Sequence, residues 1–265
     1  MMLSYLDYVK NKDLLLKGVY ESIQCYNPLF GAELEFYYFG DQARVESILK
    51  SSCIEIEGFE RERGKQQYEI QFKKTPDPLF LATQIFNVKA LLTDALFDAK
   101  PFDDDYGSAI HIHISFYDNE NLFIKNPKII NNILGGLCVN AAASMIFFAP
   151  FDASYKRFVK YYDAPTHIAW GGNNRTTILR IPDSDDHNKR IEHRLAGADA
   201  EPALVIAAII AAIHLGIRDN IEAPKRIYGN AFDAQYGLAP LPGSLAEAEL
   251  LFSDSEVKGV LDSIS

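Results

Sequence analysis

Basic residues are under-represented in this sequence, in which 26 lysines and arginines face 36 aspartates and glutamates for a net charge of -10. A protein that binds nucleic acid must neutralise phosphates with a basic surface, so this balance argues against a nucleic-acid partner. Cysteine is also scarce: Cys25, Cys53 and Cys138 lie far apart and fit no zinc or redox spacing. We therefore expect reduced thiols in a cytoplasmic protein.

Long hydrophobic runs, linkers and repeats are missing too. The longest apolar run, residues 203–217, is too short to cross a bilayer and predicts a core helix. Acidic and basic residues interrupt the apolar pattern at the N-terminus, which does not fit a secretory signal. Because no Gly/Ser-rich stretch or block of charge divides the chain, we expect residues 1–265 to form one domain without membrane contact.

Hydrophobic periodicity predicts an α+β fold. Alternating patterns typical of strands occur at residues 32–39, 66–72, 108–118, 176–182 and 189–195. Helical patterns occur at residues 3–24, 43–52, 78–98, 127–150 (one helix or two) and 202–217. Since the helices do not alternate regularly with the strands, the strands are expected to pair mainly antiparallel, with helices flanking the sheet.

The segment KRIEHRL has a charged side chain at every second position. A strand places Arg190, Glu192 and Arg194 on one face, and Ile191 and His193 on the other. Such a charge ladder is ordinary on a solvated strand. It fits equally a cleft that holds anionic and cationic groups together.

Other segments also carry polar residues on one strand face, and the opposite face carries isoleucine, leucine and phenylalanine residues that must be buried. Their polar positions are Glu33, Glu35, Glu62, Glu69, His111, His113 and Ser115. Each group alone also fits an exposed strand edge or a hydrogen-bonded histidine. Carboxylates two positions apart repel unless they are solvated, protonated or bridged by cations. Together with imidazole they suit Mg²⁺ or Mn²⁺, and nearby arginines suggest a phosphate or carboxylate shared with the metal.

Several motifs in a fixed order resemble one family. They are GAELEFYYF, ERGKQQYE, GSAIHIHIS, the long segments 154–182 and 189–217, and LPGSLAEAELLFSDS. From about residue 30 to residue 260 the chain resembles the catalytic domain of glutamine synthetase. The resemblance implies the glutamine synthetase/guanido kinase-like catalytic fold, a curved and mainly antiparallel sheet with flanking helices.

The same resemblance implies ATP and two or more Mg²⁺ or Mn²⁺ ions as cofactors. One cation would bind Glu35, Glu62 and Glu69, and the other would bind Glu33, His111 and Glu192. Contacts to ATP would come from His113, Ser115, Arg180 and Arg190.

For the acid substrate, the resemblance implies contacts from Arg157 and Arg194, beside Gly107 and Tyr106. Tyr106 stands where the family usually has an asparagine. Arg175 would stabilise the phosphoryl group in flight, and Asp163 occupies the flap position that usually carries glutamate. Arg157, Asp163 and Arg175 are therefore the expected catalytic residues.

The expected activity is that of an ATP-dependent carboxylate–amine ligase, which forms an acyl phosphate of glutamate or a related acid and then an amide with ammonia or an amine. Only 32 residues precede Glu33, so residues 1–30 are expected to form a helical extension in place of the family's N-terminal β-grasp domain. Two alternatives stay open: a non-catalytic nucleotide- or glutamate-binding homologue, and a phosphotransferase with another acceptor. A homo-oligomer is possible, because family members usually form rings.

Overall fold

A seven-stranded sheet organises the part of the chain that the computed structural model describes, residues 4–117, 126–159, 164–185 and 188–264. Its strand order is β2-β3-β1-β4-β7-β6-β5. All neighbouring strands pair antiparallel except β5 and β6. The expected α+β fold with a mainly antiparallel sheet is therefore confirmed.

The long strands lie in the first half of the chain. The strands are β1 (Pro28–Tyr37), β2 (Ile56–Arg61), β3 (Gln67–Thr75), β4 (Ile110–Phe116), β5 (Trp170–Gly171), β6 (Leu179–Arg180) and β7 (Ile191–His193). The α-helices are α1 (Tyr5–Lys10), α2 (Lys12–Glu21), α3 (Gln42–Ser51), α4 (Pro78–Leu91), α5 (Pro127–Val139), α6 (Met145–Phe148), α7 (Pro202–Arg218), α8 (Leu245–Ser253) and α9 (Glu256–Asp262). Short 3-10 helices occur at Gln24–Tyr26, Asp152–Arg157 and Ala234–Tyr236.

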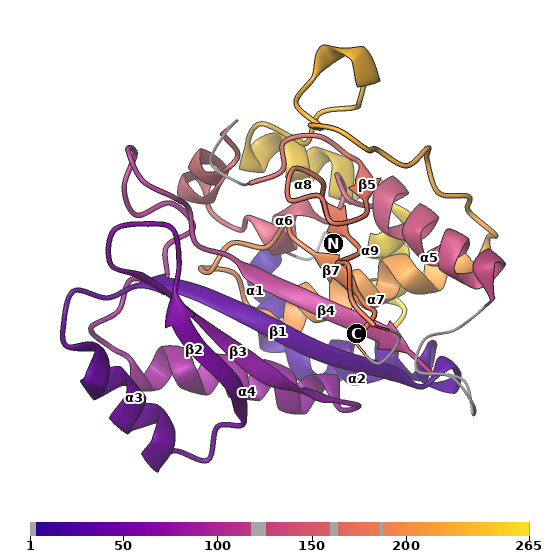
Figure 1. Cartoon of the computed structure of the whole chain (residues 1–265). Helices are drawn as coiled ribbons and strands as arrows, with labels where there is room; N and C mark the ends of the chain where they lie inside the picture. The colour runs from indigo at the N-terminus through magenta and orange to yellow at the C-terminus, as the bar shows by residue number, and fades with distance from the viewer. Residues whose placement is uncertain (1–3, 118–125, 160–163, 186–187, 265) are drawn as a thin grey trace.

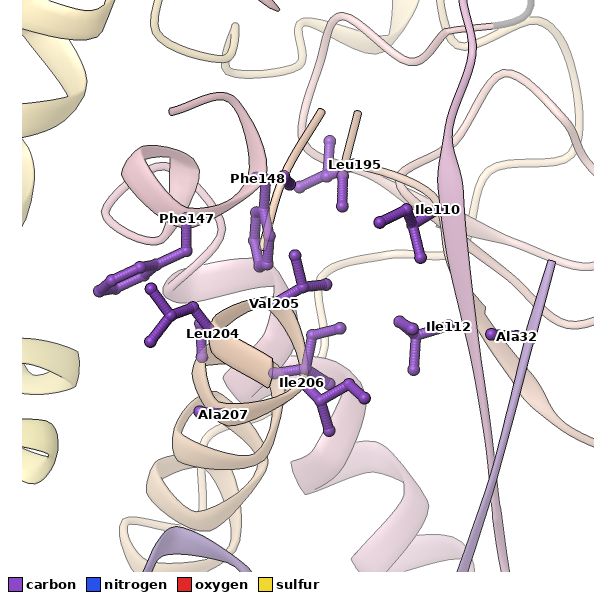
Figure 2. Close-up of a cluster of buried hydrophobic side chains, with 14 of the residues drawn as sticks. Ala32, Ile110, Ile112, Phe147, Phe148, Leu195, Leu204, Val205, Ile206 and Ala207 are labelled. Atoms are coloured by element: carbon purple, nitrogen blue, oxygen red, sulfur yellow. The ribbon is translucent and has the colours of Figure 1, made fainter. Parts of the chain in front are cut away.

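Helix α7 is the centre of the core. Its residues are apolar on every side, and α2, α4 and α5 all pack against it (Figure 1). A helix without a polar face is stable only when other elements surround it. Figure 2 shows Val205 and Ile206 of this helix on the side of Ile110 and Ile112 of β4, whereas Leu204 lies beside Phe147 of α6. Burying each such side chain contributes about 1.5–3 kcal/mol.

Strand β4 is buried along its whole length, and its two faces have different partners. The isoleucines at positions 110, 112 and 114 lie in the hydrophobic core. His111, His113 and Ser115 alternate with them and therefore point away from the core. The helices thus cover one face of the sheet and leave the other for polar groups.

Several element boundaries differ from the sequence prediction. The helix expected at residues 3–24 is two helices, α1 and α2, which meet at Asn11. The helix expected at residues 78–98 ends at Leu91, and the strand expected at 176–182 is reduced to two residues. Strand β2 was not predicted, because this edge strand lacks a regular alternation of buried and exposed positions. Within the described residues, no helix is long and apolar enough to cross a membrane.

Candidate functional site

Strand pairing brings the predicted polar positions to one face of the sheet. Glu33 of β1 lies opposite His111 of β4, and Glu35 lies opposite Glu69 of β3. Residues directly opposite one another in a sheet project to the same face, with neighbouring side chains in contact. The register alone therefore gathers these groups over the central strands.

Glu33 lies between the two histidines of β4. Its Oε2 is 3.2 Å from Nδ1 of His111, and its Oε1 is 3.3 Å from Nε2 of His113. Nδ1 of His111 is also 3.9 Å from a carboxylate oxygen of Glu35 and 3.9 Å from one of Glu192. His111 is thus central to the cluster, within reach of three carboxylates.

Three sets of side chains bring their ligand atoms within 4.8 Å of one another. The sets are Glu35–Glu62–Glu69, Glu33–Glu69–His111 and Glu33–His113–Glu192. The first equals the set expected for one cation. The other expected set is divided: Glu33 belongs to both the second and the third set, His111 to the second and Glu192 to the third. The third set also contains His113, which was expected to contact the nucleotide. Carboxylate oxygens with one imidazole are suitable donors for Mg²⁺ or Mn²⁺.

Electrostatics within the first set favour a bound cation. Burial, together with the neighbouring Glu62 carboxylate, raises the pKa of Glu35 to about 8. Burial and the Glu33 carboxylate raise the pKa of Glu69 to about 9. Carboxylates resist ionisation in this way when negative charge is concentrated without a counter-ion. A divalent cation would remove that cost, so the residues present fit the metal that the resemblance implies.

Glu192 has a different environment, because two arginines contact it. Arg180 Nη1 donates a 2.6 Å hydrogen bond to Oε2, and Arg194 donates to Oε1. Burial is the largest single influence and would raise the pKa of Glu192, but the charges of Arg194, His111 and His113 together outweigh it and lower the pKa to about 2. Asn173 fixes Arg180 from the other side, since its Oδ1 accepts a 3.0 Å hydrogen bond from Nε and a second bond from Nη2.

Arg157 is buried beside Gly107. Its Nη1 and Nη2 donate to the backbone carbonyls of Leu195 and Arg194, at 2.9 and 3.1 Å. Burial lowers the pKa of Arg157 to about 10. Gly107 packs against this side chain so closely that an added Cβ would lie 2.8 Å from its Cγ. Arg157 therefore supports the backbone that carries Arg194 as well as lining the cavity.

A polar cavity opens beside the carboxylates, with an empty volume of about 380 Å³ that includes the open solvent at its mouth. Its lining residues are Glu35, Glu62, Arg63, Gln67, Tyr106, Gly107, His111, Arg157, Ala164, Arg175 and Arg194. A second cavity lies next to it on the same face and is lined by Gly31, Ala32, Glu33, Glu57, Gln71, Phe72, Lys74, His113, Asn188 and Arg190. Glu33 and His113 in the second cavity contact each other, and His111 of the first contacts Glu33, so the cavities meet at the cluster.

The structure brings together most residues predicted for ATP and for substrate. Tyr106, Gly107, Arg175 and Arg194 line the first cavity, and Arg190 lines the second. The hydroxyl of Ser115 donates to the backbone carbonyl of Lys189. Arg180 contacts Glu192. Asp163 lies outside the described residues.

Sequence reasoning missed three residues of this region: Arg63, Gln67 and Asn173. The first two lie within the ERGKQQYE motif, where the two glutamates attracted attention. Asn173 lies in the segment 154–182, in which the arginines attracted attention. A buried amide such as Gln67 needs hydrogen-bond partners, and that requirement was the available signal.

Comparison with known proteins identifies the family of this chain. The sequence model described as "Glutamine synthetase, catalytic domain" matches residues 42–263. The chain belongs to the glutamine synthetase family. It is 33% identical over 224 residues to gamma-glutamylputrescine synthetase PuuA of Escherichia coli (strain K12), covering 79% of this chain and 48% of the relative. It is 32% identical over 233 residues to glutamate–isopropylamine ligase of a Pseudomonas species, covering 82% of this chain and 51% of the relative.

The solved structure of GmaS without ligand has the same fold. It superposes with a TM-score of 0.80 and 26% identity, covering 94% of this chain and 69% of GmaS. The match extends over all but a small part of the chain, which confirms the predicted glutamine synthetase-like architecture. The chain spans about half the length of the two curated relatives that it matches here.

Proposed function

We propose that this protein is an ATP-dependent carboxylate–amine ligase that activates glutamate, or a closely related acid, and joins it to an amine or ammonia. The observation that carries the proposal is the convergence of five glutamates and two histidines next to a cavity lined by arginines. Phosphoryl transfer depends mainly on positioning and charge neutralisation, for which cations and arginines are the suitable groups. The family relationship supports the same chemistry.

The reaction has two steps. A carboxylate oxygen of the acid attacks the γ-phosphorus of ATP, and the bond from that phosphorus to the bridging oxygen of ADP breaks. The amine nitrogen then attacks the carbonyl carbon of the acyl phosphate, phosphate leaves, and the nitrogen loses a proton. The products are the amide, ADP and phosphate.

The chain's own residues supply most of the electrostatics. Glu35, Glu62 and Glu69 would hold one cation, with Glu33, Glu192 and the histidines at the other position. Bound Mg²⁺ or Mn²⁺ would neutralise phosphate charge. Arg175, which is exposed at the cavity, would offer its guanidinium to the phosphoryl group. Buried Arg194 and the backbone near Gly107 would hold the acid.

The amine is the open part of the proposal. PuuA and the isopropylamine ligase are named for alkyl amines, whereas the family model is named for glutamine synthesis. In this chain Tyr106, an aromatic side chain, lines the cavity beside Gly107. An aromatic surface favours apolar contact with an alkyl chain. We therefore propose a primary alkyl amine ahead of ammonia.

A panel assay tests the proposal. Purified protein with ATP, Mn²⁺ and glutamate is given ammonium, methylamine, isopropylamine or putrescine, and both phosphate and amide are measured. Phosphate release that depends on one amine and equals the amide formed supports the ligase. Glu62→Gln should abolish turnover, whereas Glu46→Gln, on the exposed helix α3 and paired with Lys50, should leave it unchanged. Nucleotide binding without turnover for any amine would instead support the non-catalytic homologue.

A further inference from the structure

Two segments meet at the edge of the first cavity. The turn 62–67 carries Glu62, and the loop 105–109 carries Tyr106 and Gly107. The segments are about 40 positions apart in the sequence, and one lies between β2 and β3 whereas the other leads into β4. Side chains from each segment reach across to the backbone of the other.

Gln67 forms the first link, with a side chain that is 2% exposed. Its Oε1 accepts a 2.9 Å hydrogen bond from the backbone N–H of Gly64, within the turn. Its Nε2 donates a 2.9 Å bond to the carbonyl of Gly107 and a 3.3 Å bond to the hydroxyl of Ser108. The carbonyl of Gln67 also accepts from the N–H of Glu62 at 2.9 Å. Gln67 therefore connects the turn that carries Glu62 with the loop 105–109.

Asp105 forms the second link in the opposite direction. Its Oδ2 accepts a 2.8 Å hydrogen bond from the N–H of Lys65, in the turn. Its Oδ1 accepts a 2.8 Å bond from the N–H of Tyr106, in its own loop. Asp105 is also largely buried, and buried polar groups of this kind are costly to leave unpaired. Displacing either segment would break bonds at both links.

A third contact connects the loop to the cluster directly. Oε2 of Glu35 accepts a 2.9 Å hydrogen bond from the N–H of Ala109. Glu35 and Glu62 belong to the same set of ligand atoms. The loop is bonded directly to Glu35 at Ala109, and at Asp105 it is bonded to Lys65 of the turn that carries Glu62. A network that is fully bonded responds as a unit when one member is fixed.

We propose that Gln67 and Asp105 are positioning residues that couple the turn 62–67 to the loop 105–109, so that a cation bound at Glu62 also orders the loop beside the acid substrate. The substrate contact of this loop rests on the proposed function. The coupling itself depends only on cation binding and on the hydrogen bonds described.

Hydrogen exchange read by mass spectrometry, with and without Mn²⁺, tests the coupling without turnover. In the unchanged protein, Mn²⁺ should slow exchange in peptides that contain the turn and in peptides that contain the loop, each by at least about fivefold. Gln67→Met keeps the side-chain volume but removes the bonds to Gly64 and Gly107. The loop should then lose most of the Mn²⁺ effect, whereas the turn, which keeps Glu62 and its backbone bond to residue 67, should keep more of it. Gln84→Met is the matched control, because Gln84 is also buried and accepts from the N–H of Glu55 far from the loop.

Asp105→Ala provides a second variant, since alanine has no side-chain oxygen and accepts neither the bond from Lys65 nor the bond from Tyr106. It decides the question alone if Gln67→Met does not fold. Equal protection of the loop in both linker variants and in the unchanged protein would overturn the proposal. So would Mn²⁺ that protects the turn but not the loop, or neither segment, in the unchanged protein. Amide formation is not used in this test, so a failed ligase assay and a failed coupling remain distinguishable.

Discussion

Replacing Glu69 by glutamine should stabilise the metal-free protein and reduce the stabilisation that a bound metal gives. Glu69 shares its set with Glu35 and Glu62, with ligand atoms within 4.8 Å of one another. At that separation and an effective dielectric constant of about 20, two ionised carboxylates repel by about 3.5 kcal/mol. Partial protonation reduces this cost, so we expect Glu69→Gln to stabilise the metal-free protein by about 1–3 kcal/mol.

Metal binding should cancel most of this advantage. Mn²⁺ at one hundred times its Kd stabilises the folded state by about 2.7 kcal/mol, which raises Tm by about 5–10 °C in a chain of this size. Glu69→Gln removes a charged ligand and should lose most of this increase. The assay is thermal unfolding of both proteins in EDTA and in a Mn²⁺ series, with Glu46→Gln as the control on exposed α3. A variant that keeps the full Mn²⁺ shift, or that melts below the unchanged protein in EDTA, would refute the reasoning.

Three further predictions concern the rest of the molecule. Burial raises the pKa of the Cys138 thiol to about 12, so a thiol reagent should label the two exposed cysteines rapidly and Cys138 only on unfolding; three fast thiols would contradict the packing of α5. Gly136→Ala should destabilise the protein by about 1–2 kcal/mol in urea unfolding, because the added Cβ would lie 2.2 Å from the carbonyl oxygen of Ala212 in α7. The control Gly259→Ala in α9, where an added Cβ would have no atom within 4 Å, should be neutral or stabilising. Lys89 donates to the carbonyl of Ala200, and burial lowers its pKa from 10.5 to about 8. Between pH 8 and pH 10.5 the unfolded chain binds more protons than the folded chain, so the free energy of unfolding should rise with pH in this range. Lys89→Met should therefore be more stable than the unchanged protein by about 1–3 kcal/mol below pH 8, and this difference should vanish near pH 10.5. A difference in urea midpoint that does not change with pH would contradict the assignment.

The polar face of the sheet was predictable because strand geometry has a strict period. Glu33, Glu35, His111 and His113 alternate with buried residues, so the pattern fixed their common face before any pairing was known. Which positions lie opposite one another depends on register, which the motifs did not specify. Glu192 was assigned to a cation, and the additional contact of its carboxylate with Arg180 emerged only from the pairing of β6 with β7.

Features that depend on long-range contacts were not predictable. Helix α4 ends at Leu91 although apolar residues continue to Phe97, since the chain turns there. Gln67 has no periodic signature, and its function as a link follows from a loop about 40 positions away. The close approach of α5 and α7 at Gly136 likewise depends on a partner helix that local sequence does not reveal.

The central claim is that the carboxylate of the acid attacks ATP before the amine reacts. Glutamate labelled with ¹⁸O in its side-chain carboxylate, incubated with ATP, Mn²⁺ and the amine that supports turnover, tests this claim most directly by mass spectrometry of the released phosphate. Transfer through an acyl phosphate predicts one ¹⁸O atom in each phosphate and one lost from the acid. Phosphate that carries no label while ATP is consumed would contradict the account.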